Sequence, residues 1–150
     1  MLDRAARRLV DPVLEQLASA AQQRNLTANQ VTVAGFACGL AAMAAIALQS
    51  YGLGLLLLAN RIADGVDGAL AKRNGPTDLG GYLDIVLDFI IYAGAAFAFA
   101  LAQPEHAVAA AFLIFSFMGT GSSFLAFAIF AAKRKLDGEA AANKSFYYLG

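Results

Sequence analysis

Five aspartates lie within residues 63–88, which read ADGVDGALAKRNGPTDLGGYLDIVLD. Asp64 and Asp67 are three residues apart, and Asp84 and Asp88 are four residues apart. On a helix, either spacing places the two carboxylates on one face. These four acids also fall in or beside strongly apolar segments, where an ionised side chain is costly to bury. The cost indicates that a counter-charge offsets them.

A divalent cation is the counter-charge that best fits the pattern. Gly75 and Pro76 predict a turn, so the two acidic faces would lie on antiparallel neighbouring helices and converge near one end. Converging carboxylates repel one another unless a cation lies between them. All-oxygen ligation suits Mg²⁺, Mn²⁺ or Ca²⁺, and two such ions about 3.5–4 Å apart can clamp the attacking and leaving oxygens of a phosphoryl transfer. We therefore expect a metal site, and the pattern favours two ions. The fifth acid, Asp78, falls in the turn and is expected to be solvated. The expected metal ligands are Asp64, Asp67, Asp84 and Asp88.

Small residues accompany the acids. Gly68, Ala71, Gly80 and Gly81 lie on or beside the predicted acidic faces. A missing or short side chain lets a ligand approach the helix backbone closely. This pattern favours a bulky, metal-bound phosphate as the substrate.

Acids inside apolar segments also mark ion and proton pathways in transporters. A cation-coupled transporter, or a membrane protein without catalytic activity, is therefore the alternative function. A pathway needs polar groups through the middle of the membrane, whereas these acids gather near one face. The third and fourth apolar segments offer no acid deeper than Asp88.

The composition sets the environment of these acids. The 150 residues are 59% hydrophobic and 15% charged, with a mean hydropathy of +0.59. Soluble domains are nearer half apolar and a quarter charged, and a chain this small has too little interior to bury the excess. We expect an integral membrane protein. The single cysteine, Cys38, allows no disulfide within the chain.

Four apolar stretches are each close to the roughly 20 residues that a helix needs to cross a bilayer. Backbone groups in lipid must bond within their own segment, so helices are expected. The fold class is therefore an all-α, polytopic membrane helix bundle. The last residues, SFYYLG, read either as the start of a fifth span in a truncated chain or as a short interfacial end, and we favour truncation. The four stretches are about 31–48, 53–70, 82–102 and 107–132.

Basic residues indicate the orientation. Ten of the eleven Lys and Arg residues flank alternate ends of the apolar stretches and would share one side; the exception, Arg61, lies inside the second stretch. The positive-inside rule makes that side cytoplasmic. The N-terminus and the acidic site would then face the cytoplasm, in the inner membrane of a prokaryote.

The segment 1–26 precedes the membrane domain, which we expect over 27–150. Apolar residues recur in it at spacings of three and four, with charged residues on the other faces, which predicts an amphipathic helix, or two joined at Asp11 and Pro12. It would lie along the membrane interface or cap the bundle.

The acidic pattern resembles a known signature. Residues 64–72, DGVDGALAK, are followed by seven residues and then by Gly80, Asp84 and Asp88 at intervals of four. This arrangement is similar to the signature of the CDP-alcohol phosphatidyltransferases, D-x-x-D-G-x-x-A-R, then G-x-x-x-D-x-x-x-D. One constrained position departs: Lys72 stands where the family has Arg, which keeps the charge but loses the planar fork.

The resemblance implies a six-helix bundle, usually a homodimer, that serves phospholipid biosynthesis. The family transfers a phosphatidyl-type group from a CDP-linked lipid, such as CDP-diacylglycerol, to a small alcohol and releases CMP. It implies Mg²⁺ or Mn²⁺ as cofactor and the lipid bilayer as surroundings; no nucleic-acid partner is expected. The acceptor is not encoded in the signature.

Residue roles follow from the same resemblance. Asp64, Asp67 and Asp84 would bind metal, and Asp88 would complete the metal site and act as general base. The CDP site would be lined by Gly68, Ala71, Lys72 and Gly80.

Two further residues each have two alternative interpretations. Residues 27–32, TANQVT, are similar to the family's segment that opens the first membrane helix, so Asn29 would lie near the nucleotide or cap that helix. Arg61 would pair with one of the acids or reach a phosphate of the acceptor.

Overall fold

The computed structural model describes residues 2–133, with side chains from residue 10 onward. Within this part of the chain every regular element is a helix, which confirms the all-α class. The start of a fifth span, expected at 145–150, lies outside the described residues. The long helices are α1 (Leu2–Gln23), α2 (Ala28–Ala47), α3 (Leu56–Asn74), α4 (Asp78–Ala102) and α5 (Ala107–Lys133), with short 3₁₀ helices η1 (Tyr51–Leu55) and η2 (Pro104–His106).

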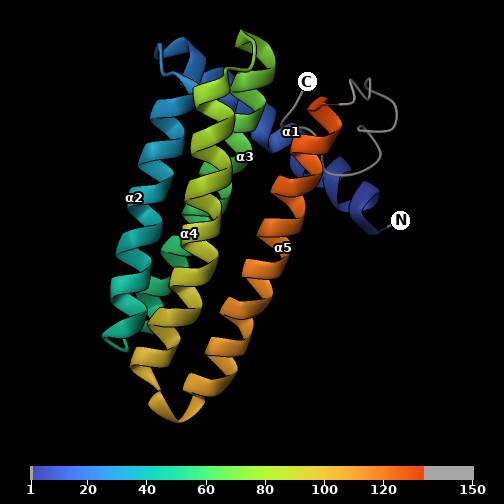
Figure 1. The fold of residues 1–150 in the computed structure, drawn as a ribbon. Coiled ribbons are helices and arrows are strands. Elements are labelled where there is room, and N and C mark those ends of the chain that lie inside the picture. Colours follow the sequence, from blue (N-terminus) through green and yellow to red (C-terminus); the bar gives the residue numbers. More distant parts are fainter. Residues whose placement is uncertain (1, 134–150) are drawn as a thin grey trace.

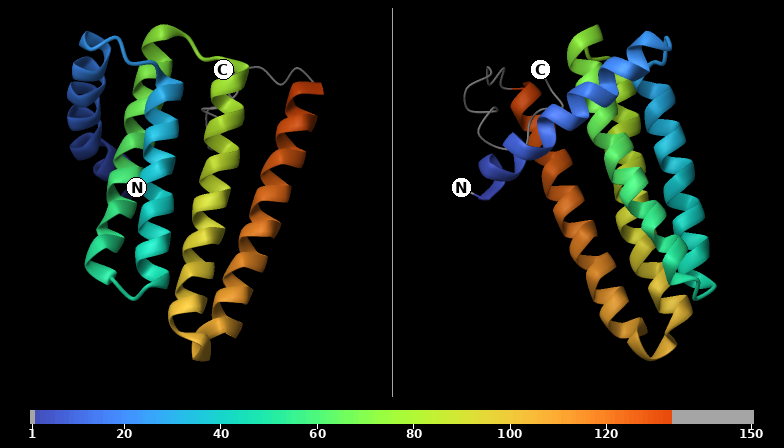
Figure 2. Two further views of the ribbon diagram at one scale, coloured as in Figure 1. Left: turned by 90° about the vertical axis from the view of Figure 1, so that its left-hand side faces the viewer. Right: turned by 180° about the vertical axis from the view of Figure 1, so that it is seen from behind.

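Helices α2 to α5 run up and down along one common direction (Figure 1). Helix α2 packs against both α3 and α4, whereas α5 packs along α4 and leans outward from the others. Helix α1 crosses one end of the bundle obliquely and packs on α3 (Figure 2). We call this the α1 end; it also holds the turn between α3 and α4. The connections from α2 to α3 and from α4 to α5 form the opposite end.

Three of these helices are long and apolar enough to cross a membrane: Ala28–Ala47, Asp78–Ala102 and Pro104–Lys133. Helix α3 carries five charged residues among its 19 and does not meet the same measure of composition. It nevertheless runs beside α2 along the bundle. At about 1.5 Å per residue, its length is close to the roughly 30 Å of a bilayer core. Two of the charges that lower the apolarity of α3 belong to the acidic pattern, Asp64 and Asp67, and the other three are basic.

Glycines bring the central helices together. A Cβ on Gly35 would lie 2.6 Å from Ala63 Cβ in α3, and one on Gly39 would lie 2.3 Å from Ile91 Cδ1 in α4. Ala63 has no side-chain freedom with which to make room, so the contact at Gly35 requires glycine, whereas at Gly39 the end of the Ile91 side chain would have to shift. Helix α2 is therefore the narrow element against which α3 and α4 both pack.

Helix α1 is one continuous helix with Pro12 inside it, so the two-helix alternative is wrong. Its Ala18 is buried against Val66 and Leu70 of α3. At the end of α3, Arg73 forms an ion pair with Glu15 of α1. These contacts show that α1 caps the bundle. A second apolar face remains exposed, formed by Val10, Val13 and Leu17.

Local signals fix where the site-bearing helices begin. Thr27 caps α2 in a reciprocal pair with Gln30: the Gln30 N–H donates to Thr27 Oγ1 at 3.3 Å, and the Thr27 N–H donates to Gln30 Oε1 at 3.0 Å. Thr77 caps α4 by accepting the Gly80 N–H at 3.0 Å. Between α3 and α4, Gly75 has φ +89°, a backbone conformation that favours glycine. The turn is therefore only three residues long, 75–77.

Candidate metal and active site

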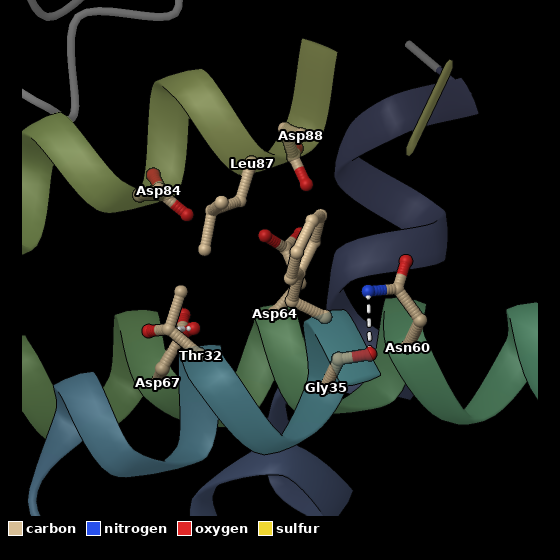
Figure 3. A pocket seen from close by; sticks show the side chains of 9 residues that line it. Thr32, Gly35, Asn60, Asp64, Asp67, Asp84, Leu87 and Asp88 are labelled. Carbon is tan, nitrogen blue, oxygen red and sulfur yellow. Dashed lines mark hydrogen bonds between the residues drawn. The ribbon is translucent and has the colours of Figure 1, made fainter. Parts of the chain in front are cut away.

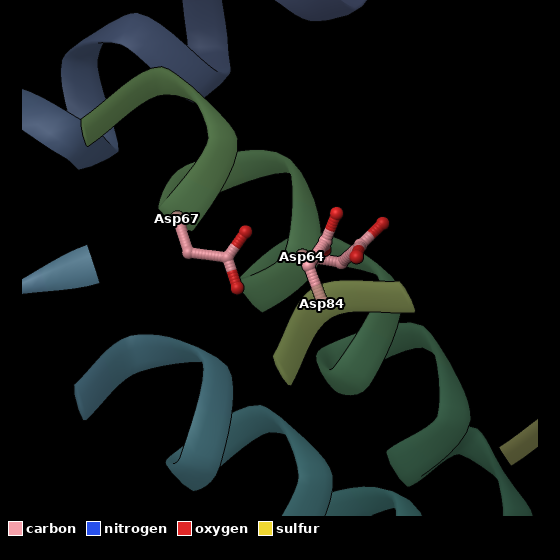
Figure 4. Close-up of side chains that lie close together, drawn as sticks. All are labelled: Asp64, Asp67 and Asp84. Atoms are coloured by element: carbon pink, nitrogen blue, oxygen red, sulfur yellow. The ribbon is translucent and has the colours of Figure 1, made fainter. Parts of the chain in front are cut away.

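Three of the four expected metal ligands lie together. Asp64 and Asp67 project from α3 and Asp84 from α4, and one carboxylate oxygen of each lies within 4.8 Å of the others (Figure 4). We call these residues the three-aspartate group. Asp67 is only 4% exposed, and the other two are partly buried. Carboxylates this close and this poorly hydrated are typical of a cation site, because their mutual repulsion is otherwise uncompensated.

Thr32 joins helix α2 to the three-aspartate group. Its Oγ1 lies 2.5 Å from Asp67 Oδ2 and 3.0 Å from the backbone oxygen of Ala28. The hydroxyl can donate its hydrogen to Asp67 and so hold that carboxylate in place. Thr32 was not predicted as a site residue, although it lies in the TANQVT segment at the start of α2.

Asp88 lies one turn further along α4 and has different partners. Arg61 donates to both of its oxygens, from Nη2 to Oδ1 at 2.5 Å and from Nη1 to Oδ2 at 3.2 Å. Tyr92 donates its hydroxyl to Oδ2 at 2.9 Å. Of the two readings of Arg61, the structure shows the ion pair, with Asp88 as its close partner and Asp64 at 3.7 Å. The three-aspartate group and Asp88 therefore differ in their contact with Arg61, which donates to both oxygens of Asp88 but lies 3.7 Å from Asp64.

The acids line one small pocket between α2, α3 and α4 (Figure 3). Its floor is α2, and the acids face one another across it from α3 and α4. The pocket therefore offers only carboxylate, hydroxyl and amide oxygens as ligands. The lining residues are Thr32, Gly35, Phe36, Asn60, Asp64, Asp67, Asp84, Leu87 and Asp88.

The residues expected around the nucleotide lie toward the α1 end. Gly68 is exposed, and a Cβ built on it would have no neighbour within 4 Å. A Cβ on Gly80 would lie 3.1 Å from Asn29 Oδ1, so Asn29 borders the start of α4. Thr27, rather than Asn29, caps α2, and the capping alternative for Asn29 is wrong. Ala71 and Lys72 follow Gly68 by one turn in the last part of α3, where Lys72 is exposed.

A metal-bound phosphate would need carboxylates to hold the metal and free space beside the helix backbone, and the three-aspartate group and Gly68 provide these two features. The fold and the site thus define a class, and comparison with known proteins identifies the same one. The family model for CDP-alcohol phosphatidyltransferase matches residues 25–145, so the chain belongs to this family. Transfer of a phospholipid headgroup component from a CDP-alcohol is the chemistry of this family.

Individual relatives differ in how much of the chain they match. The inner membrane protein YnjF of Escherichia coli is 49% identical over 152 aligned residues, which cover all of this chain and 74% of that protein. The archaetidylinositol phosphate synthase of Methanothermobacter thermautotrophicus is 39% identical over 84 residues, covering 55% of this chain and 40% of its own length. The synthase of the same name from Pyrococcus horikoshii is 34% identical over 90 residues, covering 59% and 48%. The chain thus spans under half of the archaeal proteins. No solved structure matches it significantly.

Proposed function

We propose that this protein transfers a phosphatidyl-type group from CDP-diacylglycerol, or a related CDP-linked lipid, to a small alcohol and releases CMP. The proposal is carried by one observation: three carboxylates from two helices have oxygens within 4.8 Å of one another, and a fourth carboxylate lines the same pocket. In phosphoryl transfer the protein mainly positions the reactants and offsets charge. This pocket would supply both a cation site, formed by the three-aspartate group, and a general base, Asp88.

The three-aspartate group suits Mg²⁺ or Mn²⁺. Its ligand atoms are all oxygens, and Thr32 orients Asp67, as a ligand's outer hydrogen bond would. Asp64, Asp67 and Asp84 would hold the ion, with Asp88 completing a two-ion site. The bound metal would offset negative charge on the donor's phosphates.

Asp88 would act as the general base. The acceptor hydroxyl attacks the phosphorus of the lipid phosphate, its proton passes to the Asp88 carboxylate, and the bond to the bridging oxygen of CMP breaks. A carboxylate in this role contributes about 10²–10⁴-fold to the rate.

The cytidine diphosphate would lie along the end of α3. Gly68 leaves the backbone open there, and Lys72 places a positive charge one turn further on. Gly80 and Asn29 lie together at the facing start of α4 and α2. The diacylglycerol chains would remain in the bilayer, with the site on its cytoplasmic side. We expect the membrane domain to begin near residue 27 and to work as a homodimer.

Release of CMP tests the proposal. The protein, purified and reconstituted in lipid, is given CDP-diacylglycerol, Mg²⁺ or Mn²⁺, and a panel of alcohols: glycerol 3-phosphate, serine, inositol and inositol phosphate. Two relatives are named archaetidylinositol phosphate synthases, which places inositol phosphate first in the panel. We expect CMP with at least one acceptor, none with a chelator present, and a fall of about 10²-fold or more in Asp88→Asn.

Asp78→Asn is the matched control, because Asp78 is an exposed aspartate at the start of the same helix. It should keep full activity. If no acceptor yields CMP and Asp88→Asn changes nothing measurable, the enzymatic proposal fails and cation transport becomes the reading to test.

A further inference from the structure

The side chain of Asp88 is held on both of its oxygens. Arg61 reaches Oδ1 at 2.5 Å and Oδ2 at 3.2 Å, and the Tyr92 hydroxyl reaches Oδ2 at 2.9 Å. A carboxylate with two donors in a fork and a third at its side has a fixed orientation. By contrast, nothing in the proposed function requires an arginine or a tyrosine at this depth of the bundle.

The arginine is itself held along its other edge. Nε and Nη2 of Arg61 donate to Asn60 Oδ1 at 3.0 and 2.8 Å, and Nη1 donates to the Tyr92 hydroxyl at 2.8 Å. The guanidinium carbon also lies 5.1 Å from the centre of the Tyr92 ring. Arg61 is therefore clamped between an amide, a phenol and a carboxylate, and it cannot swing freely.

Asn60 transmits the position of helix α2 to this arginine. It is 5% exposed, and its Nδ2 donates to the Gly35 backbone oxygen at 3.0 Å (Figure 3). An amide that donates on one side must present its oxygen on the other, which is the side where Arg61 lies. The chain of contacts thus runs from the α2 backbone through Asn60 and Arg61 to Asp88.

Tyr92 extends the same chain to α5. Its ring lies 5.7 Å from the ring of Phe117 and 6.1 Å from that of Phe89. The phenol is therefore packed from two sides, and its hydroxyl points at Asp88 and Arg61.

We propose that Arg61 and Tyr92 are positioning residues for Asp88, and that Asn60 fixes Arg61 in that role. The inference rests on the proposed function, in which Asp88 takes the proton of the acceptor alcohol. A side chain placed by a fork, a phenol and a backbone-anchored amide can present one oxygen edge to the acceptor in every catalytic cycle. Small displacements of a catalytic group cost large factors in rate, which is why such placement has value.

A simpler role would be charge compensation alone, in which any cation beside Asp88 suffices. Lysine distinguishes the two roles, because it keeps the charge but has neither the fork nor the second edge that meets Asn60. Under positioning, Arg61→Lys lowers kcat by about tenfold or more, whereas charge compensation leaves kcat within about twofold. Arg73→Lys is the matched control, since Arg73 also pairs with a carboxylate and lies in the same helix. It should leave kcat unchanged.

Tyr92→Phe tests the phenol separately. It removes only the hydroxyl and keeps the ring against Phe117, so kcat should fall by about threefold to thirtyfold. The KM for the CDP-lipid should stay within about threefold, and so should the affinity of the three-aspartate group for Mn²⁺, measured by direct binding. Tyr51→Phe is the control, because it also removes a hydroxyl that accepts a hydrogen bond, from Gln103 Nε2 at 3.1 Å, but at the opposite end of the bundle.

Failure of the positioning inference and failure of the proposed function give different results. If the wild-type protein is active and both Arg61→Lys and Tyr92→Phe keep their kcat, the positioning inference is overturned and the proposed function stands. If either variant loses the Mn²⁺ ion held by the three-aspartate group in step with activity, the residue acts on those ligands and not on Asp88, and the positioning inference is again wrong. If one variant unfolds, the other decides. A wild-type protein that yields no CMP with any acceptor overturns both.

Discussion

The helices are held together by different kinds of contact at the two ends of the bundle. At the opposite end, Gln49 Nε2 donates to the Ala102 backbone oxygen at 2.8 Å, and Gln103 Nε2 donates to the Tyr51 hydroxyl at 3.1 Å. The first of these neutral amides satisfies a backbone oxygen in the last turn of α4, which has no partner within its helix, and the second joins two side chains. Toward the α1 end, Thr27 and Thr77 also cap helix ends, but a group of acids lies in addition within the helices, where the backbone is already bonded.

The contrast separates contacts that the fold needs from contacts that it tolerates. Neutral side chains at a helix end replace water that the fold has removed. The three-aspartate group takes the place of no such lost hydrogen bond. Its carboxylates repel one another inside a low-dielectric bundle, and this repulsion lowers the stability of the protein unless a cation is bound. Substitution of residues that lower the stability of the metal-free protein should therefore reduce activity without destabilising the fold.

The largest expected effect comes from the acids themselves. Asp84→Asn keeps the shape of the side chain but removes one charge from the three-aspartate group, so activity should fall by about 10²-fold or more. The melting temperature without metal should stay the same or rise, because the repulsion on Asp64 and Asp67 is relieved. Metal-free thermal unfolding and CMP release, measured on the same preparation, check both halves.

Unfolding of Asp84→Asn at a lower temperature than the wild type would contradict the comparison, since it would make the acidic group a fold-stabilising one. In that case the two ends of the bundle would differ only in the charge of their contacts.

A smaller effect is expected at the open backbone of α3. Gly68→Ala adds a Cβ that meets no atom within 4 Å and raises helix propensity, so stability should rise by about 0.5–1 kcal/mol. If the donor lies against this backbone, its KM should increase about tenfold. Gly119→Ala is the control, because Gly119 in α5 is also free of neighbours within 4 Å and lies outside the pocket. It should gain similar stability and keep its KM; an unchanged KM in both variants would remove Gly68 from the donor site.

The smallest effect is expected at the opposite end. Gln49→Ala loses the bond to Ala102 and should cost about 0.5–1.5 kcal/mol, with activity unchanged. Gln49 has φ +60°, so Gln49→Gly should recover part of that loss by removing the strain of a left-handed residue. Thermal unfolding of the two variants measures the difference. A loss of activity in Gln49→Ala would show that the opposite end is coupled to the site.

Much of the fold could be predicted, since composition and spacing determine it. The apolar runs predicted helices within a few residues of α2, α4 and α5, and Gly75 predicted the turn that separates α3 from α4. The acidic spacing predicted that Asp64, Asp67 and Asp84 would meet, because residues three and four apart share a helix face.

What the sequence could not show depends on contacts between helices. The partner of Arg61 was left open, because residue spacing along α3 offers Asp64, whereas packing of α4 offers Asp88 at a shorter distance. Thr32, Asn60 and Tyr92 were missed as site residues for the same reason: their roles come from residues 25 to 35 positions away, across helix interfaces. A polar residue in an apolar helix was the available signal for each.

The turn between α3 and α4 has a consequence for insertions and deletions. Only residues 75–77 separate the two helices: α3 ends just before Gly75, which has a positive φ, and Thr77 caps α4. One residue added inside either helix between Lys72 and Gly80 would rotate everything beyond it by about 100°. Asp84 would then leave the face that meets Asp64. The number of residues between Lys72 and Gly80, seven, therefore matters more than their identity, because it keeps the acids of α3 and those of α4 on facing sides of the two helices.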